Sequence, residues 1–134
     1  MRIVVDTGIF SASLSQLRRQ GFITQVQLMA GNQIFLAAVT VSELRYGALV
    51  AGWGAQRRGR LEERIRATTV VPVSDRLLTT AAELRFACRR NAHPLADRGH
   101  ANDLRIAAST IHIGAPLLSA DKVFHDTPGL GLLR

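Results

Sequence analysis

The sequence has few of the residues that mark disulfide-bonded or membrane-embedded proteins. Cys88 is the only cysteine among 134 residues, so no intramolecular disulfide can form. No apolar stretch approaches the ~20 residues that a membrane span needs. The first apolar run, Ile3-Val4-Val5, stops at once at Asp6, which is too early for a signal peptide. We therefore expect a cytoplasmic protein with no membrane segment.

Aromatic residues are also scarce, at 5% of the chain, whereas 47% of all residues are hydrophobic. The core must then be aliphatic, built from Leu, Ile, Val and Ala. Such a composition does not fit a disordered chain. A length of 134 residues suffices for one domain and is too short for two. We expect a single domain over residues 1–134.

Lysine is nearly absent, because Lys122 is the only one beside sixteen arginines. The net charge is nevertheless +7, and the guanidinium group carries a planar fork of donors that fits phosphate. This balance favours a polyanionic partner such as nucleic acid, but an arginine-biased genome would give the same composition. The densest basic cluster, residues 56–60 with Arg64 and Arg66, is either an RNA-facing helix or a solvated face.

Apolar residues alternate between two kinds of pattern along the chain. Short apolar runs predict buried strands at 2–5, 34–39, 69–73 and 116–118, with a weak edge strand at 130–133. Longer helical patterns lie between them, at about 9–20, 21–30, 42–52, 54–67, 75–91 and 101–113. Strands that alternate with helices predict an α/β fold, here with a central, mostly parallel sheet of four to five strands flanked by helices.

Acidic side chains are few, and several of the ten follow predicted strands. Asp6 ends the first strand, Glu43 comes shortly after the second, and Asp121 shortly after 116–118. Ligand sites of open parallel sheets gather at the carboxyl ends of the strands, so these three carboxylates should share one crevice. Asp103 opens the helix at 101–113 and can reach the same edge.

Four carboxylates in one place repel one another unless a cation joins them. Mg²⁺ and Mn²⁺ prefer oxygen ligands, polarise a phosphate and lower the pKa of a bound water. A carboxylate cluster in basic surroundings therefore suits hydrolysis of a phosphodiester bond.

Each acid also has a purely structural interpretation. Residues 40–43 form a capping-box pattern in which Thr40 is the N-cap and Glu43 reaches back. Asp103 suits a helix N-terminus, Asp6 a turn, and Asp121 a surface ion pair with its neighbour. Any single acid is weak evidence, and the hypothesis depends on all four lying at one edge.

Four motifs then resemble the PIN-domain family in their order and spacing. They are Arg2 to Thr7, Thr40 to Leu44, Asn102 to Ala108 and Leu118 to Phe124, followed by Pro128-Gly129-Leu130. The resemblance covers the whole chain. Length and arginine content resemble the VapC-type toxins of toxin–antitoxin pairs.

This resemblance implies a Mg²⁺- or Mn²⁺-dependent endoribonuclease of one PIN-like domain. It assigns metal binding and catalysis to Asp6, Glu43, Asp103 and Asp121, and it implies an RNA substrate, a cognate antitoxin and a homodimer. Thr7 and Ser119 would support the carboxylates or a phosphate oxygen. The segment 91–100 matches no motif and is a candidate for substrate specificity.

Other readings fit less well. Asp6-Thr7-Gly8 spells the aspartic-protease triplet, but that fold is all-β and this chain is rich in helical patterns. A phosphoryl-transfer fold with Asp6 as the nucleophile usually has a second acid two residues later, and this chain has Gly8 there. A receiver-like fold needs a phosphoacceptor Asp at the end of the third strand, and Asp75 at that place looks like part of a helix cap. A catalytically inactive PIN-like RNA-binding or regulatory module is the main alternative.

Overall fold

The computed structural model describes residues 1–133, and a parallel four-stranded sheet lies at its centre. The strands are β1 (Arg2–Val5), β2 (Gln33–Ala37), β3 (Thr69–Val71) and β4 (Leu117–Leu118), in the order β3-β2-β1-β4. Every pair is parallel, with Val4 opposite Phe35 on one side and Leu117 on the other. The predicted α/β class with a parallel sheet is confirmed.

Helical segments connect the strands and cover both faces of the sheet. The α-helices are α1 (Thr7–Ser13), α2 (Gln16–Arg19), α3 (Ile23–Met29), α4 (Ala38–Val50), α5 (Ala55–Arg66), α6 (Asp75–Arg90) and α7 (Ala101–Ile113). The short 3-10 turns are η1 (Gln20–Phe22), η2 (Pro94–Ala96), η3 (Arg98–His100) and η4 (Lys122–Phe124). Among residues 1–133, no helix has the length and apolar character to cross a membrane.

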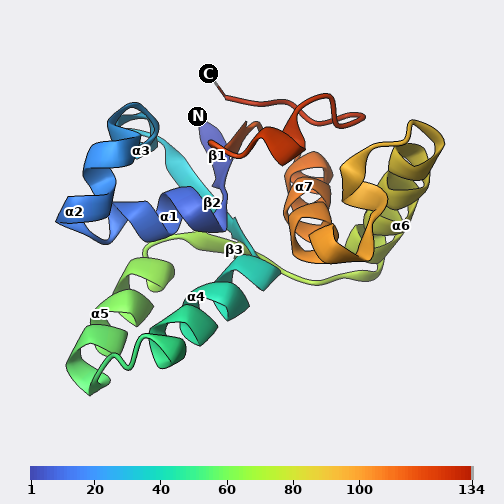
Figure 1. The fold of residues 1–134 in the computed structure, drawn as a ribbon. Coiled ribbons are helices and arrows are strands. Elements are labelled where there is room, and N and C mark those ends of the chain that lie inside the picture. Colours follow the sequence, from blue (N-terminus) through green and yellow to red (C-terminus); the bar gives the residue numbers. More distant parts are fainter. Residues whose placement is uncertain (134) are drawn as a thin grey trace.

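Alternating side chains of the strands feed two separate aliphatic cores. Val4 and Leu117 pack with α6 and α7 on one face, where Cys88 is fully buried. Ile3 and Val5 pack on the other face with α1, α4 and α5. Figure 1 shows the two layers on opposite sides of the sheet. Burial on both faces explains why the strands are so uniformly apolar.

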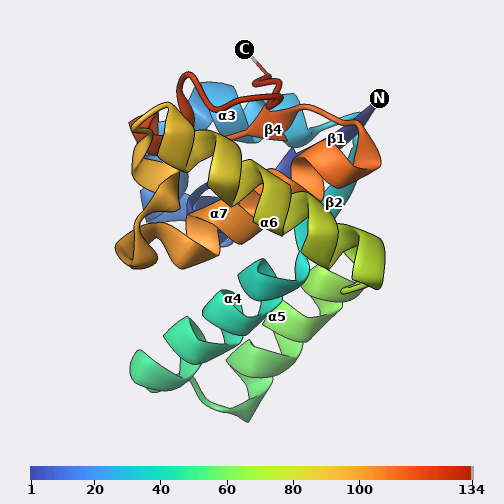
Figure 2. The ribbon, with the colours of Figure 1, turned by 90° about the vertical axis from the view of Figure 1, so that its right-hand side faces the viewer.

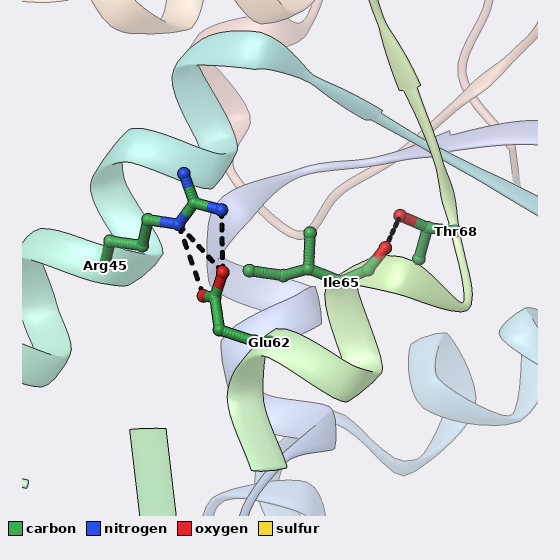
Figure 3. Close-up of polar contacts among 4 residues, drawn as sticks. All are labelled: Arg45, Glu62, Ile65 and Thr68. Atoms are coloured by element: carbon green, nitrogen blue, oxygen red, sulfur yellow. Dashed lines mark hydrogen bonds and ion pairs between the residues drawn. The ribbon is translucent and has the colours of Figure 1, made fainter. Parts of the chain in front are cut away.

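Helices α4 and α5 form a hairpin that extends beyond the sheet (Figure 2). Gly52 allows the turn between them, because its φ of +71° favours glycine. Arg45 of α4 donates to both carboxylate oxygens of Glu62 on α5, with a shortest distance of 2.7 Å (Figure 3). At the end of α5, the Thr68 hydroxyl donates to the carbonyl of Ile65 at 2.7 Å. These contacts join the hairpin and end its second helix before β3.

Element boundaries differ from the sequence-based ones in several places. The pattern at 9–20 and 21–30 is broken into α1, α2, η1 and α3, β2 ends at Ala37 and α4 begins at Ala38 instead of residue 42, and β3 ends at Val71 instead of residue 73. The weak edge strand expected at 130–133 is reduced to an isolated parallel bridge between Leu132 and Leu117. The Ser74 hydroxyl caps α6 by accepting from Leu77 N, and Gly114 ends α7 at φ +67°.

Candidate active site

The strand order places one crevice at the carboxyl end of the sheet. β2 and β3 follow β1 on one side and β4 lies on its other side, so the order reverses between β1 and β4. A hollow of about 370 Å³ lies at this edge. It is lined by Asp6, Thr7, Gly8, Ile9, Phe22, Glu43, Asp103, Ile106, Ala120 and Asp121. All four predicted acids therefore line the same hollow.

Asp6 is the most buried of the four acids, with 6% of its surface exposed. It follows β1 directly and is the N-cap of α1, where Oδ1 accepts from Ile9 N at 2.8 Å. Oδ2 accepts from the Ser119 hydroxyl. Burial raises the pKa of Asp6, the two hydrogen bonds oppose this effect, and the negative charges of Asp121 and Asp103 raise the pKa further. The charge of Asp6 is thus crowded and poorly solvated.

Ser119 connects Asp6 to Asp121 across the gap between β1 and β4. Its hydroxyl donates to Asp6 and accepts from Asp121 N at 3.0 Å. Asp121 is exposed and is the N-cap of η4, with Oδ1 accepting from Val123 N at 2.9 Å. Each aspartate therefore has a structural role at a helix start in addition to its place in the hollow.

Glu43 is held by Thr7 and does not cap a helix. The Thr7 hydroxyl donates to Glu43 Oε1 at 2.7 Å and lies 3.1 Å from Oγ1 of Thr40. The predicted capping box is wrong, because α4 already begins at Ala38 and Thr40 is fully buried inside its first turn. The apolar run of β2 continues directly into α4, so the sequence carries no polar signal at this boundary. The expected support by Thr7 and Ser119 is confirmed.

Asp103 lies in the first turn of α7, as predicted. Its Oδ2 is 3.3 Å from Nδ1 of His100, and its side chain is 32% exposed. The preceding residue, Asn102, lies 3.4 Å from Oε2 of Glu43 through its amide nitrogen. Asn102 is a member of the site that the sequence analysis passed over, although its place beside Asp103 was a usable signal.

Phe22 is the one aromatic side chain that lines the hollow among the described residues. It belongs to η1, between α2 and α3, and is half-buried against the core on the α1 side of the sheet. Its distance along the chain from every acidic motif explains why no sequence signal indicated it. The hollow thus combines acidic groups with one apolar ring.

The donor set of the hollow fits a hard divalent cation. Four carboxylates supply the oxygen ligands that Mg²⁺ and Mn²⁺ prefer. A cation would also stabilise the charge of Asp6, whose pKa is raised chiefly by burial and further by the negative charges of Asp121 and Asp103. Within residues 1–133, no three His, Cys, Asp or Glu side chains are already grouped to hold a metal ion. A bound ion would therefore require these side chains to turn towards one another.

A comparison with protein-family models matches the PIN domain over residues 3–130 of the chain. A comparison with curated protein sequences finds no match.

Solved VapBC structures resemble this fold at low sequence identity. VapBC2 of Rickettsia felis, bound to a DNA fragment of its promoter, aligns with a TM-score of 0.80, 21% identity and coverage of 99% of this chain and 98% of that one. VapBC-1 of nontypeable Haemophilus influenzae gives a TM-score of 0.75, 19% identity and coverage of 99% and 97%. The DNA-bound VapBC of Salmonella typhimurium aligns with a TM-score of 0.69, 18% identity and coverage of 99% of this chain and 97% of that one.

Proposed function

The chain belongs to the PIN-domain family, and from this premise we propose that it is a metal-dependent endoribonuclease, the toxin of a toxin–antitoxin pair. The observation that carries the proposal is the hollow in which Asp6, Glu43, Asp103 and Asp121 meet at the strand-order reversal. The sixteen arginines and the net charge of +7 suit a polyanionic substrate. The bond cleaved is a phosphodiester of RNA.

Asp6, Asp103 and Asp121 would hold Mg²⁺ or Mn²⁺, with Glu43 as a further ligand or as the group that orients the attacking water. The ion supplies charge that polarises the scissile phosphate and lowers the pKa of water. Glu43 suits the orienting role because each of its two oxygens has its own donor, Thr7 at 2.7 Å and Asn102 at 3.4 Å. Ser119 keeps Asp6 turned into the hollow through its hydroxyl.

The proposal includes two protein partners. One is a cognate antitoxin, which the resemblance to VapC-type toxins implies and the similarity to the VapBC structures supports. The other is a second copy of the chain. An apolar hollow of about 300 Å³ lies between α4, α6 and α7, and it includes Val73 and Leu78, which are 65% and 59% exposed. Such a patch suits a homodimer interface in a cytoplasmic protein.

An RNA-binding PIN module without catalysis is the second candidate. It is favoured by the observation that the acids of residues 1–133 are not pre-grouped around a metal position. Metal-dependent cleavage separates the two candidates, because both would bind RNA.

Cleavage of total RNA by the purified protein tests the proposal. The expected result is cleavage with Mg²⁺ or Mn²⁺ that stops in excess chelator, and loss of cleavage in Asp6→Asn. The matched control is Glu83→Gln, which removes an acidic charge from an exposed face of α6 and should cleave like the wild type. Cleavage that continues in chelator would refute the metal mechanism, and binding of RNA without any cleavage would establish the non-catalytic module.

A further inference from the structure

A second hollow, of about 650 Å³, lies outside the acidic one, on the outer face of α6. It is lined by Ala82, Arg85, Phe86, Arg89, Ala96 and Asp97. The first four recur at the spacing of one helix face, and the last two come from the segment 91–100 that matched no motif. Among residues 1–133, Phe86 is one of two largely exposed aromatic side chains, at 60%, the other being Tyr46 at 70%. Neither core nor acidic site accounts for Phe86.

Positive charge surrounds the exposed ring. The guanidinium carbon of Arg90 lies 5.8 Å from the centre of the Phe86 ring, and Arg89 is exposed beside it along the helix. Arg85 donates to the carbonyl of Ala96 at 3.2 Å, which fastens the 91–100 segment to α6. Two arginines, Arg85 and Arg89, and one acid, Asp97, line the hollow, so its net charge is positive.

A second aromatic residue flanked by arginines, Trp53, differs in one respect. The guanidinium of Arg57 lies only 3.9 Å from the centre of the Trp53 ring, so one face of that ring is already covered. The Phe86 ring is less closely covered, because the guanidinium carbon of Arg90 lies 5.8 Å from its centre. An open ring beside free cations is the combination on which a single-stranded nucleic acid stacks a base and places its phosphates.

The hollow is continuous with the acidic site along the backbone. Asp97 immediately precedes η3, and its carbonyl accepts from His100 N at 3.0 Å. His100 in turn lies 3.3 Å from Asp103. Figure 2 shows α6 and α7 side by side and antiparallel, so the end of α6 that carries Phe86 lies next to the start of α7 that carries Asp103. The six residues from Asp97 to Asp103 can span at most about 22 Å, so about seven stacked nucleotides at roughly 3.4 Å each are sufficient to connect the two sites.

We propose that Arg85, Phe86, Arg89 and Arg90 form an RNA subsite that binds the substrate strand some nucleotides away from the bond cleaved at the acidic hollow. Phe86 stacks one base, and Arg89 and Arg90 neutralise the neighbouring phosphates. The inference rests on the proposed nuclease function for its position relative to the scissile bond. RNA binding by the subsite itself does not depend on cleavage.

The test measures fluorescence anisotropy of labelled single-stranded RNA, 12 nucleotides long, with proteins that carry Asp103→Asn so that the strand is not cut. On the 12-mer, Phe86→Leu should weaken binding about fivefold or more, while Phe86→Tyr, which keeps the ring, should stay within about twofold. Arg89→Gln should also weaken binding and reduce the salt slope by about 0.7. The matched control, Arg76→Gln, removes the same charge at the other end of α6 and should change little.

Thermal melting separates the subsite from a structural role of Phe86. Its ring is 60% exposed, so Phe86→Leu should melt within about 2 °C of the parent protein. Unchanged 12-mer binding in Phe86→Leu, or weaker binding accompanied by a large fall in melting temperature, would overturn the proposal. Polyglutamate is the second probe: if it binds through Arg89 and Phe86 while RNA does not, the surface recognises an acidic polypeptide and the proposal is wrong.

The outcome is independent of the nuclease assay. Wild-type protein that never cleaves RNA, combined with ring-dependent binding of the 12-mer, refutes the proposed function and leaves the subsite standing. Metal-dependent cleavage by the wild type, combined with unchanged 12-mer binding in Phe86→Leu, supports the proposed function and refutes the subsite.

Discussion

The acids of the hollow and the arginines of α5 and α6 differ in how firmly the fold holds them. Asp6 is 6% exposed and receives hydrogen bonds from Ile9 N and Ser119. Arg60 and Arg89, in contrast, lie exposed on helix surfaces. Positioning a metal ion and a water needs fixed oxygens, whereas attraction of a polyanion needs only charge at the surface. The two regions therefore should respond differently to mutation.

The largest expected effect is on the fixed acids. Asp103→Asn keeps the shape of the side chain but removes one metal-binding charge, so cleavage should fall by more than about 100-fold. Initial rates on a labelled RNA in Mg²⁺ measure this. Arg60→Gln, a matched single-charge change on an exposed helix face, should reduce the rate severalfold at most. Equal effects of the two changes would remove the distinction between the regions.

A smaller effect is expected where the fold holds an acid indirectly. Thr7→Val removes the hydroxyl that donates to Glu43 at 2.7 Å, and cleavage should fall about 10- to 100-fold. The same change deprives the buried Thr40 hydroxyl of its neighbour and should cost about 1 kcal/mol of stability. Thr7→Ser retains the hydroxyl and is the control. If Thr7→Val and Thr7→Ser have the same cleavage rate and melting temperature, the position of Glu43 does not depend on the Thr7 hydroxyl.

A third effect concerns the pH dependence of stability without metal. Folding raises the pKa of Asp6 above 3.8, chiefly through burial, so the folded state favours the protonated form. The stability that protonated Asp6 contributes is present below pH 3.8 and is lost as the pH rises through the folded value. Asp6→Asn keeps the N-cap without the charge, so its melting temperature should exceed that of the wild type increasingly as the pH rises. A difference that is constant with pH would contradict this.

The smallest effect is expected at the exposed pair on the α4–α5 hairpin. Arg45 and Glu62 lie 2.7 Å apart, and the arginine holds the pKa of Glu62 below its ordinary value. The side chains are 57% and 34% exposed, so solvent screens the interaction and a coupling of at most about 1 kcal/mol follows. A double-mutant cycle with Arg45→Gln and Glu62→Gln measures it by denaturant unfolding. A coupling well above 1 kcal/mol would show that the hairpin is held as firmly as the acids.

The sequence predicts the sheet and the acids well because both depend on local patterns. Buried parallel strands appear as short apolar runs, and acids that directly follow such runs, like Asp6, must lie at the strand ends. Helix boundaries inside uniformly apolar stretches are harder to predict. α4 begins at Ala38 without a polar N-cap, which is why Thr40 and Glu43 were misread as a capping box.

Contacts between distant segments could not be predicted from the sequence. Phe22 reaches the hollow only because η1 folds back over α1, and Asn102 meets Glu43 only across the gap between α7 and α4. The exposed position of Phe86 likewise depends on how α6 packs against α7. These features follow from tertiary packing, for which a single sequence offers no periodic signal.

The central claim, that the acidic hollow is a metal site, is tested most directly by thermal melting of wild type and Asp6→Asn, each in chelator and in Mg²⁺. In chelator, Asp6→Asn should melt at the higher temperature, because it lacks one poorly solvated charge beside Asp103 and Asp121. Mg²⁺ at about 100 times Kd should raise the melting temperature of the wild type by roughly 10 °C and that of the variant far less. Equal shifts in both proteins, or none in either, would contradict the account.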